Sequence, residues 1–449
     1  MPQLLSFLHT IFVMGIVLGF MILIHEFGHY AAAKYFGVRV EQFAIGFGKR
    51  LVGFRKGETD YRINALPLGG YVKMSGENPM DDRTGDPGEF LSHPRWQRFV
   101  IAVAGPAMNI FLAIALLTGV YLVHYEYPAS ADGPAVVGWV EPNTPAAKAG
   151  IEVGDAIVRV DGQSNPTWED VDAKAALSPN QPLSFSIQRD GKVFDKSVTP
   201  EPYGPNQYGS IGWVPKEPNV AITSVEPNMP AQKAGMKVGD IILSVNGQKI
   251  PAIAAMIDLL TRTKNQPLQI VVDRGGHELT FTVKPVLAPN GAGESTYRIG
   301  IASYPTKTVK LSFPEAFRHS LEDNEKSSFL ILELLRKMAE RKVSIRQVDG
   351  PIGIGSAVGA AAREQGWTPL LGITAAISLN LGIMNLLPIP ILDGGVILLL
   401  LIEGLMQKDI SLRIKERIYQ AAFVFLVLFA VMVIYNDIMK TLPGLTHMP

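Results

Sequence analysis

The chain lacks cysteine and carries no net charge: its 449 residues include 41 Lys or Arg and 41 Asp or Glu. Without cysteine there is no disulfide, no thiolate nucleophile and no thiolate metal ligand, so histidine and carboxylate side chains are the candidates for any metal site. The balanced charge leads us to expect no nucleic-acid partner. The length exceeds what one core can organise and indicates about three domain-sized units.

Apolar residues, in contrast, gather in long runs. A bilayer core of ~30 Å needs about 20 apolar residues in helical form. The candidate runs cover residues 4–24, 99–123, 370–405 and 421–434. Four buried helices of a soluble protein are the alternative, but such helices are rarely apolar on every side. The first run has no basic residues before it and no small-residue cleavage site after it, so we expect it to be a retained span and not a signal peptide.

Basic residues near these runs predict the topology. They form two clusters. The cluster after the first run consists of Lys34, Arg39, Lys49, Arg50, Arg55 and Lys56. The cluster between the third and fourth runs consists of Lys408, Arg413, Lys415 and Arg417. Lys and Arg near membrane spans concentrate on the cytoplasmic side. We therefore expect both termini and residues 125–368 to lie on the outer side of the membrane.

The outer stretch contains an internal repeat. Residues 136–163 and 221–248 align without gaps at an offset of 85, with 16 of 28 positions identical. Each copy has Pro-Ala-x-x-Ala-Gly, then Gly-Asp, then a strand ending in Asp-Gly or Asn-Gly, a pattern that resembles PDZ domains of bacterial envelope proteases. Such domains receive an extended peptide at a sheet edge. The alternatives are structural modules that bind nothing and a bulky pair that excludes large substrates.

The first run continues past residue 24 into the pattern H-E-x-x-H, present as His25-Glu26-Phe27-Gly28-His29. On a helix, positions i and i+4 share a face, so both imidazoles can bind one Zn²⁺ while the glutamate lies beside the metal's water and acts as general base. Ionisable groups cost about 2.5–3.5 kcal/mol or more at the centre of a bilayer helix, so three within five residues need a function or a partner. A polar cluster without metal is the alternative.

A catalytic zinc usually has three protein ligands, and the third run offers the missing one. Its segment Asn385-Leu-Leu-Pro-Ile-Pro-Ile-Leu-Asp-Gly-Gly395 contains Asp393, the only acidic residue within residues 365–402. Pro388 and Pro390 break the helix, which is tolerated at membrane depth where the backbone lines a protein cavity. Asp393 should share the inner leaflet with the histidines. A helix cap is the other reading of this residue.

These motifs, together with Gly105-Pro-Ala-Met-Asn109 in the second run, resemble the site-2 protease family of intramembrane zinc proteases. The resemblance implies that His25, His29 and Asp393 bind zinc and that Glu26 is the catalytic carboxylate. It further implies that Asn385, with Pro390 and Asn109, contacts the substrate. For Asn109, helix packing through Gly105 is an alternative.

The family resemblance also implies the substrates: transmembrane segments of single-span proteins, above all an anti-sigma factor already trimmed on its periplasmic side, and remnant signal peptides. Residues 40–76, which have short glycine-rich strands and a turn at Lys56-Gly-Glu-Thr59, would form the family's membrane-reentrant β-loop. A helical peptide bond has its carbonyl engaged, so hydrolysis requires local extension, which pairing with a strand edge stabilises.

The expected fold is a polytopic α-helical membrane protein with four transmembrane helices, a membrane-associated β-hairpin region and two tandem periplasmic PDZ-like α+β domains. Its segments are residues 1–35, 98–125, 370–406 and 416–441 (transmembrane helices), 36–97 (cytoplasmic-side β-loop and interfacial helix), 126–215 and 216–308 (PDZ-like domains) and 309–369 (periplasmic interfacial helices). Within the last, residues 313–342 have helical apolar spacing, and Gly350-Pro-Ile-Gly-Ile354 ends the helix.

Two other functions compete. A membrane scaffold could keep an inert metal site, but such a site needs no base, and Glu26 stands beside the histidines. A metal transporter could also place His and Asp within its spans. Transporters usually have inverted repeats in the spans themselves, and the four apolar runs have none.

Overall fold

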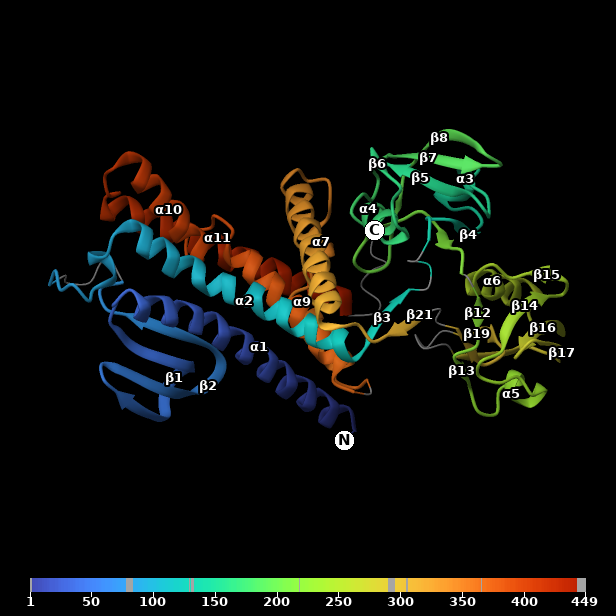
Figure 1. The fold of residues 1–449 in the computed structure, drawn as a ribbon, viewed down its shortest axis with the longest axis horizontal. Coiled ribbons are helices and arrows are strands. Elements are labelled where there is room, and N and C mark those ends of the chain that lie inside the picture. The colour runs from blue at the N-terminus through green and yellow to red at the C-terminus, as the bar shows by residue number, and fades with distance from the viewer. Residues whose placement is uncertain are drawn as a thin grey trace. The chain divides into compact units, whose positions relative to one another are not determined.

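The computed structural model describes residues 2–77, 84–128, 130, 133–217, 219–289, 295–303, 306–364 and 366–441 (Figure 1). The chain divides into two compact units. The helical unit comprises the chain up to His124, Lys310–Leu335 and the chain from Val348 onward, and the outer unit comprises Tyr125–Val309 and Arg336–Gln347.

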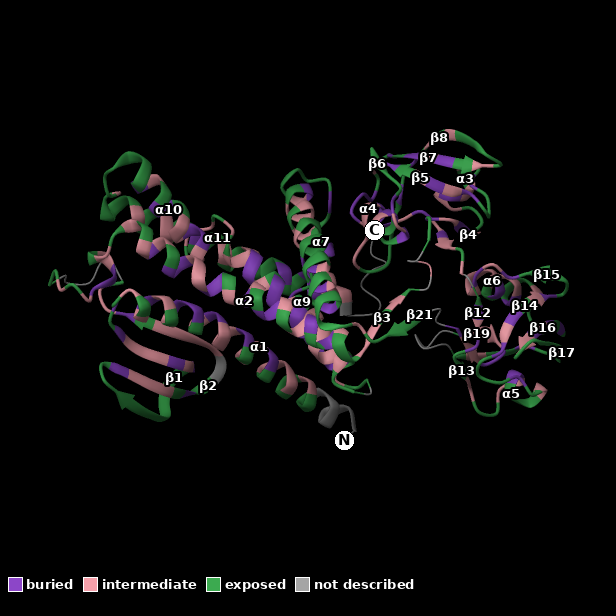
Figure 2. Cartoon of the chain, in the orientation of Figure 1, coloured by how far each residue is buried: buried purple, intermediate pink, exposed green. Residues whose placement is uncertain are grey.

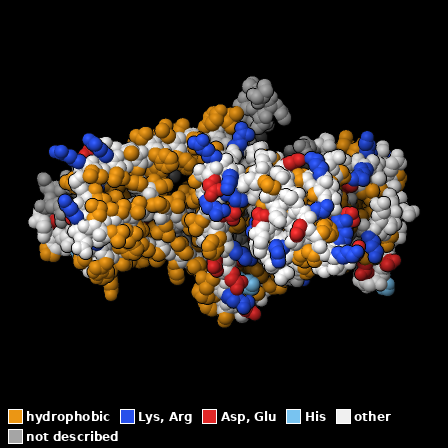
Figure 3. Space-filling model, turned by 90° about the horizontal axis from the view of Figure 1, so that it is seen from above, with side chains coloured by type: hydrophobic (Ala, Val, Ile, Leu, Met, Phe, Trp, Pro, Cys, Tyr) orange, Lys and Arg blue, Asp and Glu red, His pale blue; other side chains and the backbone are white. Residues whose placement is uncertain are grey.

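Among the described residues, four helices are long and apolar enough to cross a membrane, as predicted. They are α1 (Pro2–Tyr35), α2 (Arg95–Val123), α9 (Thr368–Asn385) and α11 (Leu412–Thr441). Many large apolar side chains on them are exposed, among them Phe12, Phe111 and Leu428 (Figure 2). Figure 3 shows hydrophobic side chains spread over much of the helical unit. Such a surface favours lipid as its surroundings.

The third apolar run is two helices, not one. α9 ends at Asn385, and α10 (Asp393–Met406) begins after a turn. Pro388 and Pro390 lie within this turn and remove two backbone donors that a continuous helix would need. The break therefore places Asp393 in the first turn of a new helix.

Between α1 and α2 lies a two-stranded sheet, β1 (Val40–Lys56) and β2 (Thr59–Met74), instead of several short strands. The strands are long because glycines bend them without ending them: Gly46 and Gly48 have φ of 81° and 86°, which other residues rarely adopt. The predicted turn is confirmed, with Gly57 at φ 61° between the strands.

Because of these bends, one stretch of β1 pairs with two separate stretches of β2. Residues 40–45 pair with residues 70–74 on one side and with residues 60–63 on the other. Residues 70–74 consequently form an edge of the sheet, with no second strand partner among the described residues. This edge lies against α1, because a Cβ added at Gly70 would be 3.6 Å from Cγ of Glu26.

Two further helices are α7 (Phe313–Ala339), which belongs to the helical unit as far as Leu335, and α8 (Pro351–Ala361). α7 fits the predicted helical spacing. The segment expected only to end that helix instead begins α8, with Pro351 at the first helical position, where proline is well tolerated. The buried carboxylate of Asp437 in α11 accepts hydrogen bonds from the Gly350 and Ile352 backbone N–H groups, both at 2.9 Å, and so holds the start of α8.

The outer unit consists of two α+β modules, and strands β3 (Tyr125–Pro128) and β21 (Thr306–Val309) pair where the chain enters and leaves. The first module contains β4 (Val137–Val140), α3 (Pro145–Lys148), β5 (Ala156–Val160), β6 (Gln163–Ser164), α4 (Trp168–Ala176), β7 (Leu183–Arg189), β8 (Lys192–Val198), β9 (Glu201–Tyr203), β10 (Tyr208–Ser210) and β11 (Trp213–Pro215). The second contains β12 (Val220–Ala221), β13 (Ser224–Val225), α5 (Pro230–Ala234), β14 (Ile241–Val245), β15 (Gln248–Lys249), α6 (Ile253–Thr263), β16 (Leu268–Arg274), β17 (His277–Val283), β18 (Val286–Pro289), β19 (Ser295–Arg298) and β20 (Ile301–Ala302).

The modules repeat each other in three dimensions. Strand order is β6-β5-β7-β8 in the main sheet of the first and β12-β14-β16-β17 in the second, with β15 also on β14. Arg189 donates from Nε and Nη2 to both carboxylate oxygens of the buried Asp155, at 2.6 and 2.7 Å. Arg274 does the same to Asp240, at 2.6 and 2.8 Å, and both residues lie 85 positions later. The internal repeat read from the sequence is therefore structural.

Candidate metal centre and active site

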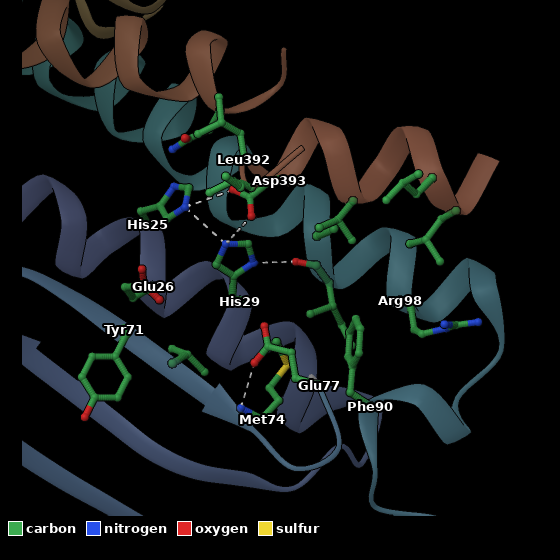
Figure 4. Close-up of a pocket in the computed structure, with 18 of the residues that line it drawn as sticks. His25, Glu26, His29, Tyr71, Met74, Glu77, Phe90, Arg98, Leu392 and Asp393 are labelled. Atoms are coloured by element: carbon green, nitrogen blue, oxygen red, sulfur yellow. Dashed lines mark hydrogen bonds and ion pairs between the residues drawn. The ribbon is translucent and has the colours of Figure 1, made fainter. Parts of the chain in front are cut away.

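His25 and His29 lie on adjacent turns of α1 and face the same way (Figure 4). Their Nε2 atoms are 3.2 Å apart, and the residues are only 8% and 9% exposed. The spacing of four residues thus brings the two ring nitrogens to one point, as the helical period requires.

Asp393 reaches the same point from α10. Its Oδ2 is 3.2 Å from Nε2 of His25, and its Oδ1 is 3.4 Å from Nε2 of His29. The two glycines after it permit this position, because a Cβ at Gly394 or Gly395 would lie 2.2 or 2.4 Å from a carbonyl oxygen of the preceding turn.

Backbone strain accompanies that turn. Ile391, two residues before the aspartate, has φ of 94°. A β-branched residue rarely adopts a positive φ, and such strain costs of the order of 1–3 kcal/mol. The packing around the turn therefore holds Asp393 at the site against a local preference.

The three side chains fit a zinc ion. Atoms bound to one tetrahedral zinc at ~2.0–2.1 Å lie about 3.3–3.4 Å from one another. The distances among the two Nε2 atoms and the carboxylate oxygens of Asp393 are 3.2 to 3.4 Å. Two imidazoles and a carboxylate are also the donor set that zinc accepts, and they leave a fourth position for water or substrate.

Helix α2 supports both histidines from behind. Nδ1 of His29 is 2.8 Å from the carbonyl oxygen of Ile101, and Nδ1 of His25 is 3.3 Å from Nδ2 of Asn109. The close approach depends on Gly105, since a Cβ there would lie 2.2 Å from Nε2 of His29. Gly28 makes the matching contact from α1, where a Cβ would be 2.3 Å from the Ala104 carbonyl oxygen.

A cavity of about 710 Å³ lies beside the three side chains. Glu26, half-buried on α1, lines it together with the histidines, and so do residues 71–74 of the β2 edge. The backbone N–H of Val72 faces the Glu26 carboxylate. One cavity therefore combines three candidate ligands, a candidate base and a strand edge.

The other predicted substrate contacts differ in position. Asn385, at the end of α9, lines the cavity. Pro390 lies in the turn before Asp393 and is not among the cavity-lining residues. Asn109 is completely buried behind His25 and does not line the cavity either, so its geometry favours a contact with the histidine over the predicted contact with substrate.

The sequence alone did not identify several polar residues that line the cavity, namely Glu77, Arg98, Glu403, Lys415 and Tyr419. Glu403 is 1% exposed, and its Oε1 lies 2.6 Å from Nζ of Lys415. An acidic residue inside an apolar run was the available signal for Glu403. Nothing in the sequence pairs it with a lysine of the next helix.

Comparison with known proteins gives a consistent assignment. The model of peptidase family M50 matches residues 13–429. A protein of Vibrio cholerae that is named as a zinc metalloprotease is 31% identical to this chain. The alignment covers 94% of this chain and 96% of the Vibrio cholerae protein. The regulator of sigma-E protease RseP of Escherichia coli is 32% identical, over 96% of this chain and 99% of its own.

Among solved structures, a PDZ domain of an SdrC-like protein from Listeria monocytogenes matches 20% of this chain and 90% of its own, with 23% identity and a TM-score of 0.17. The family model and the relatives, in contrast, span nearly the whole chain and include both halves of the candidate metal centre. The chain therefore belongs to peptidase family M50 and is a zinc metalloprotease.

Proposed function

We propose that this protein is an intramembrane protease of the bacterial inner membrane that cuts peptide bonds within transmembrane segments of single-span proteins. The observation that carries the proposal is the position of the metal centre: the candidate ligands lie on α1 and α10, within a unit of apolar helices whose outer surface suits lipid. A protease for soluble substrates has no need of such surroundings.

In this proposal, His25, His29 and Asp393 hold the zinc, and Glu26 takes the proton from the attacking water. Bound zinc supplies Lewis acidity, which activates water and polarises the scissile carbonyl. Glu26 is not a zinc ligand in this proposal. It follows His25 directly on α1 and lines the same cavity, which places it beside the reacting atoms. A protonated Glu26 can then pass its proton to the leaving amine.

The β2 edge is proposed to hold the substrate. A transmembrane helix must unwind before its peptide bonds can be attacked, and unwound backbone in lipid needs hydrogen-bond partners. Residues 70–74 offer an edge beside Glu26 that can pair with an extended segment. Asn385, which also lines the cavity, would help to hold the substrate backbone.

The substrate class is inferred from relatives. The relatives in Escherichia coli and Haemophilus influenzae both carry the name "regulator of sigma-E protease". We therefore propose that the natural substrate is an anti-sigma factor trimmed beforehand on the periplasmic side, and that remnant signal peptides are further substrates. The clusters of Lys and Arg favour periplasmic termini and a periplasmic outer unit, whose PDZ-like modules would bind a peptide or exclude untrimmed substrates.

Co-expression with a library of single-span membrane proteins tests the proposal. The wild-type chain is compared with Glu26→Gln and, as a matched control, with Glu278→Gln, which changes an exposed glutamate of β17 in the same way. We expect cleavage by the wild type and the control but not by Glu26→Gln, with the cut located by mass spectrometry inside the apolar segment. Cuts confined to residues outside that segment would contradict the intramembrane mechanism.

A further inference from the structure

The two histidines receive different support from the same helix. His29 donates its Nδ1–H to the carbonyl oxygen of Ile101 at 2.8 Å. A carbonyl oxygen can only accept, so this contact fixes the tautomer of His29 and leaves the Nε2 lone pair facing Asp393. The corresponding atom of His25, its own Nδ1, faces the side-chain amide of Asn109 at 3.3 Å.

Asn109 has the surroundings of a residue with a specific polar task. Its side chain is fully buried, and its Oδ1 has no hydrogen-bond partner among the described residues. Its backbone is fixed from the other side, since Oγ of Ser378 in α9 donates to the Asn109 carbonyl oxygen at 2.9 Å. An unsatisfied buried amide costs roughly 1–3 kcal/mol, which an apolar residue of the same size would avoid.

A zinc-bound His25 calls for the opposite orientation of this amide. An imidazole that gives its Nε2 lone pair to a metal carries its proton on Nδ1 and becomes a donor there, so it needs an acceptor. Half a turn of the Asn109 amide about its Cβ–Cγ bond exchanges nitrogen for oxygen and brings Oδ1 to face Nδ1. The histidine then has its acceptor and Oδ1 has a donor, while Nδ2 moves to the place where Oδ1 had no partner.

We propose that Asn109 is a positioning residue for the metal centre: its amide oxygen accepts the Nδ1–H of His25 and holds Nε2 toward the zinc. The proposal rests on the zinc site put forward above. It assigns the two supports to one helix, with the Ile101 carbonyl serving His29 and the Asn109 amide serving His25 eight residues later. Only the second support is a side chain, so only it can be removed by substitution.

The test is a zinc titration against a competing chelator, with the full chain purified in detergent. Asn109→Leu keeps the number and branching of the side-chain heavy atoms and removes the acceptor, whereas Asn109→Asp keeps an acceptor at the same place. Ser378→Ala is the control, because it removes a hydrogen bond to the same residue without touching His25. Thermal unfolding of each zinc-free variant reports on packing separately.

We expect Asn109→Leu to bind zinc about 10- to 100-fold more weakly, the usual effect of losing such a support, while Asn109→Asp and Ser378→Ala stay close to wild type. Asn109→Ala gives the same comparison if the leucine variant does not fold. Wild-type affinity in the folded leucine or alanine variant would overturn the proposal, and so would an equal loss in Asn109→Asp.

A further variant separates the two proposals. His25→Ala removes a proposed ligand outright and should lose far more zinc affinity than any change at Asn109. If His25→Ala binds zinc as tightly as the wild type, the proposed metal centre itself is wrong. If it loses zinc and Asn109→Leu does not, the metal centre stands and only the role of Asn109 fails.

Discussion

Gly105→Ala is the substitution for which the structure gives the sharpest expectation. The added Cβ would lie 2.2 Å from Nε2, 2.6 Å from Cε1 and 2.8 Å from Cδ2 of the His29 ring. An ordinary contact is ~3.5 Å, so ring and helix must separate by about 1.3 Å at the closest pair. Zinc sites tolerate ligand displacements of only about 0.2 Å. We therefore expect the alanine variant to lose zinc and proteolysis together.

The ring has little room to yield. Its Nδ1 is held at 2.8 Å by the Ile101 carbonyl, which belongs to the same helix as Gly105. Turning the ring away would break that hydrogen bond, and moving α2 would disturb the contact with Gly28, where a Cβ would already lie 2.3 Å from the Ala104 carbonyl oxygen. Overpacking of this kind costs typically 1–3 kcal/mol, so some loss of thermal stability should accompany the loss of metal.

Gly119→Ala is the matched control. Gly119 lies in the same helix, and a Cβ there would meet nothing within 4 Å. The same change of residue should leave zinc content and cleavage unaltered and should favour the helix slightly. Zinc content by metal analysis and cleavage of a single-span substrate are the two measurements. Full zinc occupancy with wild-type turnover in Gly105→Ala would refute the reasoning.

Three further predictions follow from the site and the repeat. Glu26→Gln should keep its zinc by metal analysis while losing cleavage, since the base is lost and the ligands remain; normal turnover would exclude Glu26 as the base. Asp393→Ala should lose most of its zinc as well as activity, and full occupancy would mean that the third ligand lies elsewhere. In the second module, the hydrogen bonds from Arg274 lower the pKa of the Asp240 carboxyl. Its contribution to stability is therefore complete above the unfolded pKa of ~3.9 and falls as the pH drops through the lower folded pKa. Arg274→Met should cost about 3 kcal/mol at neutral pH, because it leaves the buried carboxylate without its arginine partner and with only the Lys237 backbone N–H as a hydrogen-bond donor. Hydrogen exchange of β14 and β16 at pH 3 to 7 measures both effects, and equal protection in the variant would contradict them.

The sequence alone was sufficient for features governed by local periodicity. Apolar runs identify helices because lipid requires every side of a spanning helix to be apolar. The four-residue spacing of His25 and His29 places both rings on one face whatever surrounds them. The repeat at an offset of 85 residues predicted two similar modules, and the paired Arg–Asp contacts at equivalent positions bear this out. Asp393 could be selected because an isolated acid in an apolar run needs a purpose.

The tertiary structure decided what depends on elements distant in the chain. The sequence does not state that residues 70–74 form the edge facing Glu26, because that follows from bends at glycines and from pairing across the sheet. The sequence alone could not decide whether Asn109 contacts the substrate or packs helices together. The residue's partner, His25, lies 84 positions away on another helix. The same holds for the approach of α1 and α2 through Gly105. Local sequence fixes which side chains a helix presents, but only the packing of helices against one another determines what those side chains meet.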